Sequence, residues 1–180
     1  MVALASVRTG AFVLGIALFP LADAGGQTGQ EARNTSDTGY IEGPIRISVT
    51  RARQIAIQKL RSPRCRRLFE DFRDLPGRRL DDVLDALGES SPEHLLRMEF
   101  YAGERDETCA RAGVYAFTSP GRSAVFVCPA FLLLARQEPK AAANLLIHEE
   151  LHSLGVGEAP MPGLPTAQEI TRQVEERCGQ

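Results

Sequence analysis

The sequence predicts an α+β domain in residues 44–180. Its expected parts are N-terminal helices, an antiparallel sheet of three or more strands, a helix that carries a pair of histidines, and a C-terminal helix. Two observations support this fold class. Apolar residues recur at helical spacing before residue 88 and after residue 138, whereas between residues 95 and 128 they alternate with polar residues, as in half-buried strands.

The first 24 residues have the three parts of a secretory signal peptide. Arg8 supplies the positive charge, residues 11–21 are mainly apolar, and Ala22-Asp23-Ala24 is a small-residue cleavage site. The apolar run is short for a membrane span, although a retained anchor is the alternative. Residues 25–43 are rich in small polar residues and predict a disordered linker. We therefore expect an exported protein, secreted or periplasmic, with no membrane span after signal cleavage.

The elements of the domain follow from local patterns. We expect a helix between Thr50 and Leu60, a second that Ser62 caps, and a third over residues 80–87. Three strands are then expected, over residues 96–100, 113–118 and 123–128, and the last two form a hairpin. His94 stands at the predicted start of the first strand, where we expect a surface residue.

The chain has four cysteines, which suits two disulfides in an oxidising compartment. Cys109 and Cys128 flank the predicted hairpin and are expected to pair, which leaves Cys65 with Cys178. Both of these last two lie on the apolar faces of predicted helices. A cysteine zinc site is the alternative, but no C-x-x-C spacing supports it.

The helix predicted from Pro139 onward carries His148-Glu149-x-x-His152. Residues four apart lie one turn apart on one helix face, so the two imidazoles can bind one Zn²⁺ ion. Glu149 lies near that face, where it could take a proton from a zinc-bound water, whereas Glu150 points away from the histidines. The pattern therefore assigns different roles to two adjacent acids.

From Ala141 onward the chain resembles the zincins, a superfamily of metallopeptidases with this motif. The resemblance implies a minimal zincin-like domain, a zinc cofactor, and Glu149 as the catalytic base. It also implies an edge strand beside the motif helix on which an extended peptide binds, and residues 125–127 are the candidate. The expected function is a zinc-dependent hydrolase, namely a metallopeptidase that acts on a peptide or protein.

The third zinc ligand has two candidates. Gly155 and Glu158 resemble the metzincin extension of the motif, with glutamate where that family has histidine or aspartate. In gluzincins the third ligand is a glutamate on a downstream helix, a role that Glu169 would take. A capping box with Thr166 already accounts for Glu169, and we favour Glu158.

Two other functions stay open at this point. One is a non-catalytic secreted domain with a structural or vestigial zinc site, and the other is a cell-envelope amidase. Residues 44–80 are rich in arginine, but few aromatic residues lie among them, so a solvated helix face is favoured and no nucleic-acid partner is expected.

Overall fold

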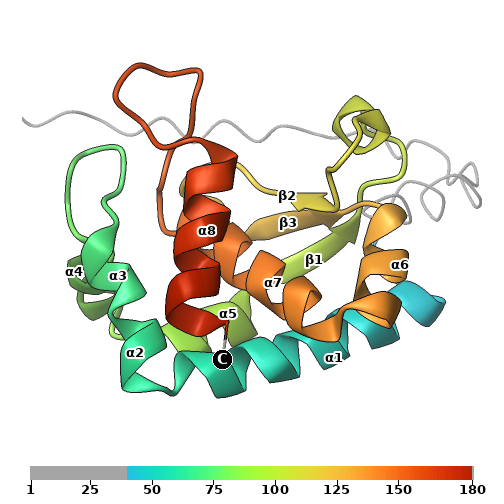
Figure 1. Ribbon diagram of the computed structural model, residues 1–180, viewed down its shortest axis with the longest axis horizontal. Helices are drawn as coiled ribbons and strands as arrows, with labels where there is room; N and C mark the ends of the chain where they lie inside the picture. Colours follow the sequence, from blue (N-terminus) through green and yellow to red (C-terminus); the bar gives the residue numbers. More distant parts are fainter. Residues whose placement is uncertain (1–39, 180) are drawn as a thin grey trace, which may run out of the picture. The chain divides into compact units, whose positions relative to one another are not determined.

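Helix α7 (Pro139–Ser153), which carries the histidine pair, is the centre of the fold in the computed structural model, which describes residues 40–179. The predicted signal peptide and residues 25–39 lie outside the described residues. Helices α1 (Gly43–Leu60), α6 (Ala130–Gln137) and α8 (Ala167–Cys178) pack against α7 (Figure 1). This packing buries α7 on nearly all sides, which is why its sequence lacks a clear polar face.

Shorter elements connect α1 to the sheet. They are the helices α2 (Pro63–Arg66), α3 (Leu68–Asp71), α4 (Leu80–Leu87) and α5 (Ser91–Arg97). A 3₁₀-helix, η1 (Glu107–Ala110), follows the first strand. The fold class is therefore α+β, as predicted.

The domain begins earlier than the sequence patterns indicate. Helix α1 starts at Gly43 rather than near Thr50, and Pro44 occupies its first turn, where proline is well tolerated. The backbone N–H of Ile41 donates to the Phe100 carbonyl at 3.4 Å, and the Ile41 side chain is buried. Residues 40–43, which the composition assigns to the linker, therefore contact the domain.

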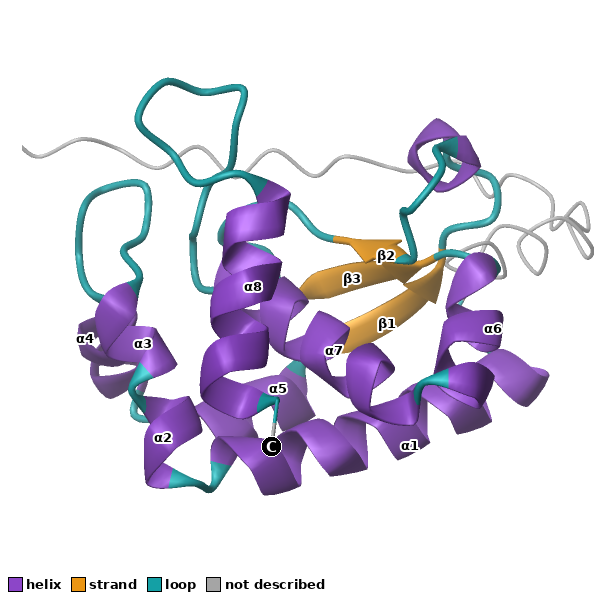
Figure 2. Ribbon diagram, viewed as in Figure 1, coloured by secondary structure: helices purple, strands orange, loops and turns teal. Residues whose placement is uncertain are grey.

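The sheet has three strands, β1 (Glu99–Ala102), β2 (Ala116–Phe117) and β3 (Ala124–Val127), in the order β1-β3-β2 (Figure 2). Strands β2 and β3 form the expected antiparallel hairpin, but β1 runs parallel to β3. The prediction of an antiparallel sheet is therefore wrong in this pairing. A short turn determines the direction of β3 relative to β2, whereas the long connection after β1 leaves its direction to tertiary packing.

Strand β3 lies in the middle of the sheet, so the expectation of an edge strand at residues 125–127 is also wrong. The edge strand on the side of α7 is β2, which contacts that helix. The local pattern of β3 could not reveal this, because central and edge strands of a small sheet have similar alternation.

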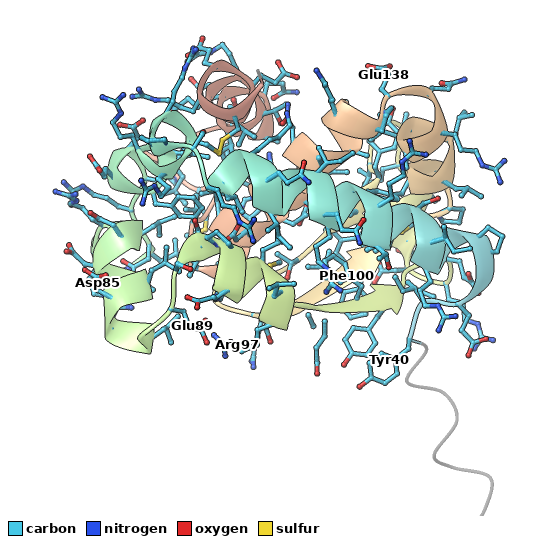
Figure 3. The ribbon with its side chains drawn as sticks, turned by 90° about the horizontal axis from the view of Figure 1, so that it is seen from below. Tyr40, Asp85, Glu89, Arg97, Phe100 and Glu138 are labelled. Carbon is cyan, nitrogen blue, oxygen red and sulfur yellow. A yellow bond between two sulfur atoms is a disulfide. The ribbon has the colours of Figure 1, made fainter. Side chains whose placement is uncertain are left out.

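His94 is buried rather than exposed. Ser90 and Glu93 form a capping box that starts α5, so His94 is helical, with 4% of its surface exposed. Its Nε2 lies 3.0 Å from the Ser153 hydroxyl on α7. Glu89 lies 3.3 Å from the other ring nitrogen and pairs with Arg97; Figure 3 labels both of these charged residues. The contact with Ser153 attaches α5 to the end of α7.

Both predicted disulfides are present. Cys65–Cys178 joins α2 to the end of α8, and Cys109–Cys128 joins η1 to the end of β3. The two bonds agree with an oxidising compartment. Within residues 40–179, no helix combines the length and the apolar character that a membrane span requires.

Candidate metal centre

The last two turns of α7 bring His148 and His152 together. Their Nε2 atoms lie 3.0 Å apart, and the two rings meet edge to face. Both side chains are buried, with 6% of each residue exposed. The spacing of four residues on a helix therefore produces the convergent nitrogen pair that the sequence predicts.

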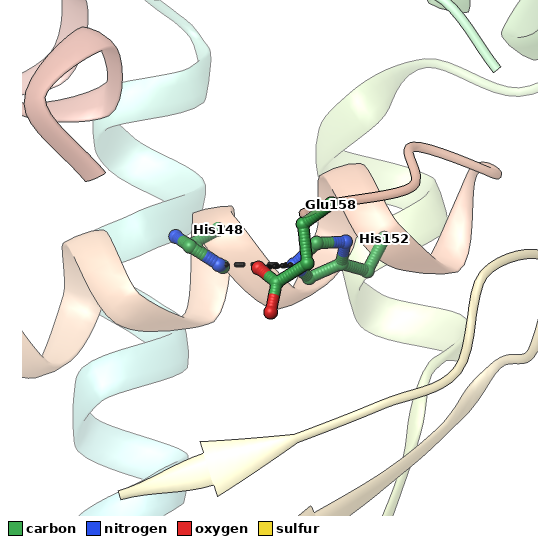
Figure 4. A group of neighbouring side chains, drawn as sticks. All are labelled: His148, His152 and Glu158. Atoms are coloured by element: carbon green, nitrogen blue, oxygen red, sulfur yellow. Dashed lines mark hydrogen bonds and ion pairs between the residues drawn. The ribbon is translucent and has the colours of Figure 1, made fainter. Parts of the chain in front are cut away.

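Glu158 completes the group from the loop after α7. Its Oε2 lies 3.4 Å from His152 Nε2, and one ligand atom from each of the three residues lies within 4.8 Å of the others (Figure 4). Ligands at about 2.0–2.1 Å from a tetrahedral zinc ion are roughly 3.3 Å apart. The spacings of 3.0 and 3.4 Å lie on either side of this value, so the two pairs that include His152 fit a zinc ion.

Contacts of two glycines bring Glu158 back toward the helix. Gly155 has a φ of 110°, and a Cβ atom there would lie 2.8 Å from the Cβ of Asp74. A Cβ on Gly157 would lie 2.6 Å from side-chain atoms of Leu75. The Leu75 N–H also donates to the Gly155 carbonyl at 2.9 Å. The loop between α3 and α4 therefore supports the turn that positions Glu158.

Each histidine has a partner for its other ring nitrogen. The Val156 carbonyl lies 2.7 Å from His152 Nδ1, and the Thr171 hydroxyl lies 3.1 Å from His148 Nδ1. A carbonyl can only accept, so His152 carries its proton on Nδ1 and its lone pair on Nε2 when neutral. Such partners orient metal-binding histidines and hold the required tautomer.

The protonation of His148 also suits a ligand. Burial, and then the charge of the neighbouring His152, lower the pKa of His148 to about 3. The imidazole is therefore neutral at neutral pH, which is the form that binds a metal.

Glu149 lies at the same site, with 3% of its surface exposed and its Oε2 atom without a hydrogen-bond partner. Burial, and then the negative charge of Glu158, raise the pKa of Glu149 to about 8, and a hydrogen bond with the Thr118 backbone opposes this rise. A cation beside Glu158 would offset the repulsion between the two carboxylates. Glu149 is thus a carboxyl group that can exchange a proton near neutral pH.

Glu150 and Glu169, the other two acids considered in the sequence analysis, lie apart from the site. Glu150 is completely buried, its two carboxyl oxygens lack hydrogen-bond partners, and burial raises its pKa well above the usual value. Glu150 is not among the residues that line the cleft with the histidines, as expected for a side chain that points away from them. Glu169 is exposed and forms the capping box with Thr166, and it does not belong to the group of converging ligand atoms.

A cleft of about 480 Å³ opens over the three candidate ligands and Glu149. Its walls include strand β2, the loop around Met161 and the start of α8. The Gly121 N–H donates to the His152 carbonyl at 2.9 Å, which attaches the β2–β3 turn to the end of α7. The edge of β2 therefore lies along the cleft, beside the candidate metal centre.

The sequence patterns did not identify Thr171, Val156, Thr118 or Asp74 as parts of the site. Thr171 lies two residues after Glu169 on a helix whose only recognised signals were its cap and its apolar face. Val156 and Thr118 act through backbone atoms, which no residue pattern reveals.

No family model, curated protein or solved structure matches this chain.

Proposed function

We propose that the chain is an exported zinc-dependent hydrolase, a metallopeptidase of the zincin type. One observation carries the proposal: His148, His152 and Glu158 converge at a cleft beside Glu149. The carboxyl group of Glu149 is buried, and its Oε2 atom has no hydrogen-bond partner among the described residues. Three protein ligands with space for a fourth are typical of catalytic zinc, whereas structural zinc sites usually have four protein ligands.

His148, His152 and Glu158 would hold the metal. A bound Zn²⁺ ion would supply a Lewis acid and lower the pKa of water at the site toward about 7. Glu149 would accept a proton from a water molecule in the cleft as the water oxygen bonds to the peptide carbonyl carbon. It would return that proton to the amine nitrogen as the C–N bond breaks. Its buried Oε2 atom has no hydrogen-bond partner among the described residues, while the Thr118 hydrogen bond restrains the carboxyl group.

The open edge of β2 supports a peptide as the substrate. An extended peptide can add to a free strand edge through backbone hydrogen bonds, independently of most of its side chains. The edge lies along the cleft that contains Glu149, so a peptide bound there passes over the proposed reaction centre. This support is specific to peptides and favours a peptidase over an envelope amidase with another substrate.

The proposed location is the periplasm or the extracellular space. The two disulfides support it, since such bonds persist in oxidising compartments. The signal-like residues 1–24 support it from the sequence alone.

Metal analysis and a cleavage assay test this function together. Purified protein from an oxidising compartment should contain about one zinc ion per chain. It should cleave members of a peptide library, lose this activity with a chelator, and regain it with added zinc. The Glu149→Gln variant is the control for contaminating peptidases, because it should retain zinc without activity. Zinc-loaded protein that cleaves no library member, or a Glu149→Gln variant as active as the parent, would contradict the proposal.

A further inference from the structure

Four aromatic rings form a row across the sheet. Tyr40 stacks on Tyr101 of β1 with ring centroids 5.2 Å apart, and Tyr101 lies 5.9 Å from Phe126 of β3. Phe126 in turn stacks on Phe117 of β2, with centroids 5.2 Å apart and planes 17° from parallel. Figure 3 shows Tyr40 where the described chain begins. Each of four neighbouring segments contributes one ring.

The register of the sheet produces this row. Tyr40 bridges Tyr101, Tyr101 pairs with Phe126, and Phe126 pairs with Phe117. Side chains at paired positions point to the same face of a sheet and are separated by about the strand spacing, roughly 4.8 Å. The row therefore advances by one ring for each strand, and a further strand would add the next position.

The row ends at Phe117, because β2 is the last strand of the sheet on that side. One face of the Phe117 ring covers Phe126, so its other face points away from β3, toward the open edge. Phe117 is also one of the residues that line the cleft with His148 and Glu149. The last residue of the row therefore borders the proposed substrate site.

The backbone of Ala116 is directed outward at this edge. The Cys128 N–H donates to the Tyr115 carbonyl at 2.9 Å, so Tyr115 is a hydrogen-bonded position of the hairpin. These positions alternate along an antiparallel pair, so Phe117 also directs its backbone groups to β3. Ala116, between them, directs its N–H and carbonyl away from β3. An added strand would bond to Ala116 and would place a neighbouring side chain beside Phe117.

We propose that Phe117 determines substrate specificity by stacking on an aromatic side chain of the bound peptide. The peptide extends the sheet at the edge of β2, and its residue opposite Phe117 adds a fifth ring to the row. The register position holds for either direction of the peptide, since paired side chains share a face in both cases. This inference rests on the proposed peptidase function, and it names the class of substrate that the site prefers.

The size of the effect follows from aromatic pairs in proteins. Such a pair gives a benefit beyond buried area that corresponds to about two- to tenfold in kcat/KM. The fair comparison is therefore phenylalanine against leucine at the same peptide position, because both are large and apolar. A pocket that selects side chains by size alone would give similar kcat/KM values for the two peptides.

The test is a set of quenched fluorescent peptides that differ at one position, cleaved by the zinc-loaded full chain. At one position, phenylalanine or tyrosine should exceed leucine by about two- to tenfold in kcat/KM. Phe117→Leu should abolish this difference, and Phe117→Tyr should keep it. Tyr101→Leu is the matched control, because it removes a ring of the same row that lies two strands from the edge.

Three results would overturn the inference: no aromatic preference in the parent, a preference that persists in Phe117→Leu, or one that Tyr101→Leu removes equally. If the parent cleaves no peptide, the proposed function fails by itself. Binding of the same labelled peptides, measured by fluorescence anisotropy, then tests the inference separately. Aromatic-selective binding that Phe117→Leu abolishes would support it, and binding without this selectivity, or no binding, would refute it.

Discussion

His152 and Val156 are joined by a hydrogen bond of 2.7 Å between the imidazole Nδ1 and the backbone carbonyl. The bond connects the last turn of α7 to the chain just beyond Gly155. It directs Nε2 toward His148, and it uses the same turn that carries Glu158 back to the helix. The orientation of His152 and the position of Glu158 therefore depend on the same short segment of backbone.

The partner of His148 is a side chain and can be changed. Thr171→Val removes the hydroxyl that contacts His148 Nδ1, so the ring loses the group that orients it. We expect zinc affinity to fall about 10-fold, the low end of the range for such partners. Thr171→Ser keeps the hydroxyl and should bind zinc like the parent. Competition titration with a fluorescent chelator measures both, and equal affinities in the two variants would exclude this role of Thr171.

The two adjacent acids of α7 should differ in function. Glu149→Gln should lower kcat at least about 100-fold, because an amide cannot accept the proton, while zinc content stays unchanged. Glu150→Gln should retain activity, because this side chain lies in the core and away from the cleft. Steady-state kinetics on one cleaved peptide compares them. Similar rates in the two variants would mean that the roles are assigned wrongly.

Glu158 and Glu169 give a second matched pair. Glu158→Ala should weaken zinc binding by more than the roughly 10- to 100-fold that follows loss of a ligand's hydrogen-bond partner. Glu169→Ala should leave zinc affinity intact and lower the melting temperature slightly, because it breaks the exposed cap of α8. Calorimetric titration and thermal melts measure the two effects. A large loss of zinc affinity in Glu169→Ala alone would identify Glu169, on α8, as the third zinc ligand.

The buried Glu150 should make stability depend on pH. Burial raises its pKa in the folded state above the usual 4.5, so the folded protein binds more protons than the unfolded chain above that pH. Stability then decreases as pH rises, by at most about 1.4 kcal/mol per pH unit for one proton. Glu150→Gln removes this contribution, whereas Glu149 contributes equally to both proteins.

Urea unfolding of the metal-free parent and of Glu150→Gln, between about pH 5 and pH 8, measures the difference. We expect the stability of the variant relative to the parent to increase with pH. A difference that stays constant over this range would show that Glu150 does not titrate with folding.

The two disulfides should contribute unequally to stability. Cys65–Cys178 spans 113 residues and Cys109–Cys128 spans 19, and the longer loop restricts the unfolded chain more. Chain entropy predicts about 4 to 5 kcal/mol for the first and about 3 kcal/mol for the second. Denaturant unfolding of the two double Cys→Ala variants compares them. Greater destabilisation from loss of the shorter bridge would contradict the entropic explanation.

The features that depend on short stretches of sequence could be predicted. The positions of His148, Glu149 and His152 follow from helix geometry, and the β2–β3 hairpin follows from its turn and alternation. The disulfides followed from the hairpin and from the inward faces of two helices. Each of these inferences needed only a local period or a pairing of few candidates.

Other features needed contacts between distant segments. The parallel pairing of β1 with β3 and the row of four rings arise from strand register, which no single strand specifies. His94 is helical because the capping box at Ser90 and Glu93 starts α5 before the alternating pattern begins. The side chain is buried where it contacts Ser153 on another helix.

The positions of two histidines on one helix face, with a carboxylate near that face, therefore follow from the sequence, because the 3.6-residue period acts on any helical segment. Tertiary structure decided that Glu158 joins them and that β2 forms the edge of the cleft. The physical reason is that Gly155 and Gly157 pack directly against Asp74 and Leu75, which are about 80 residues earlier in the chain. A contact over that separation depends on the folded core, and no local pattern encodes it.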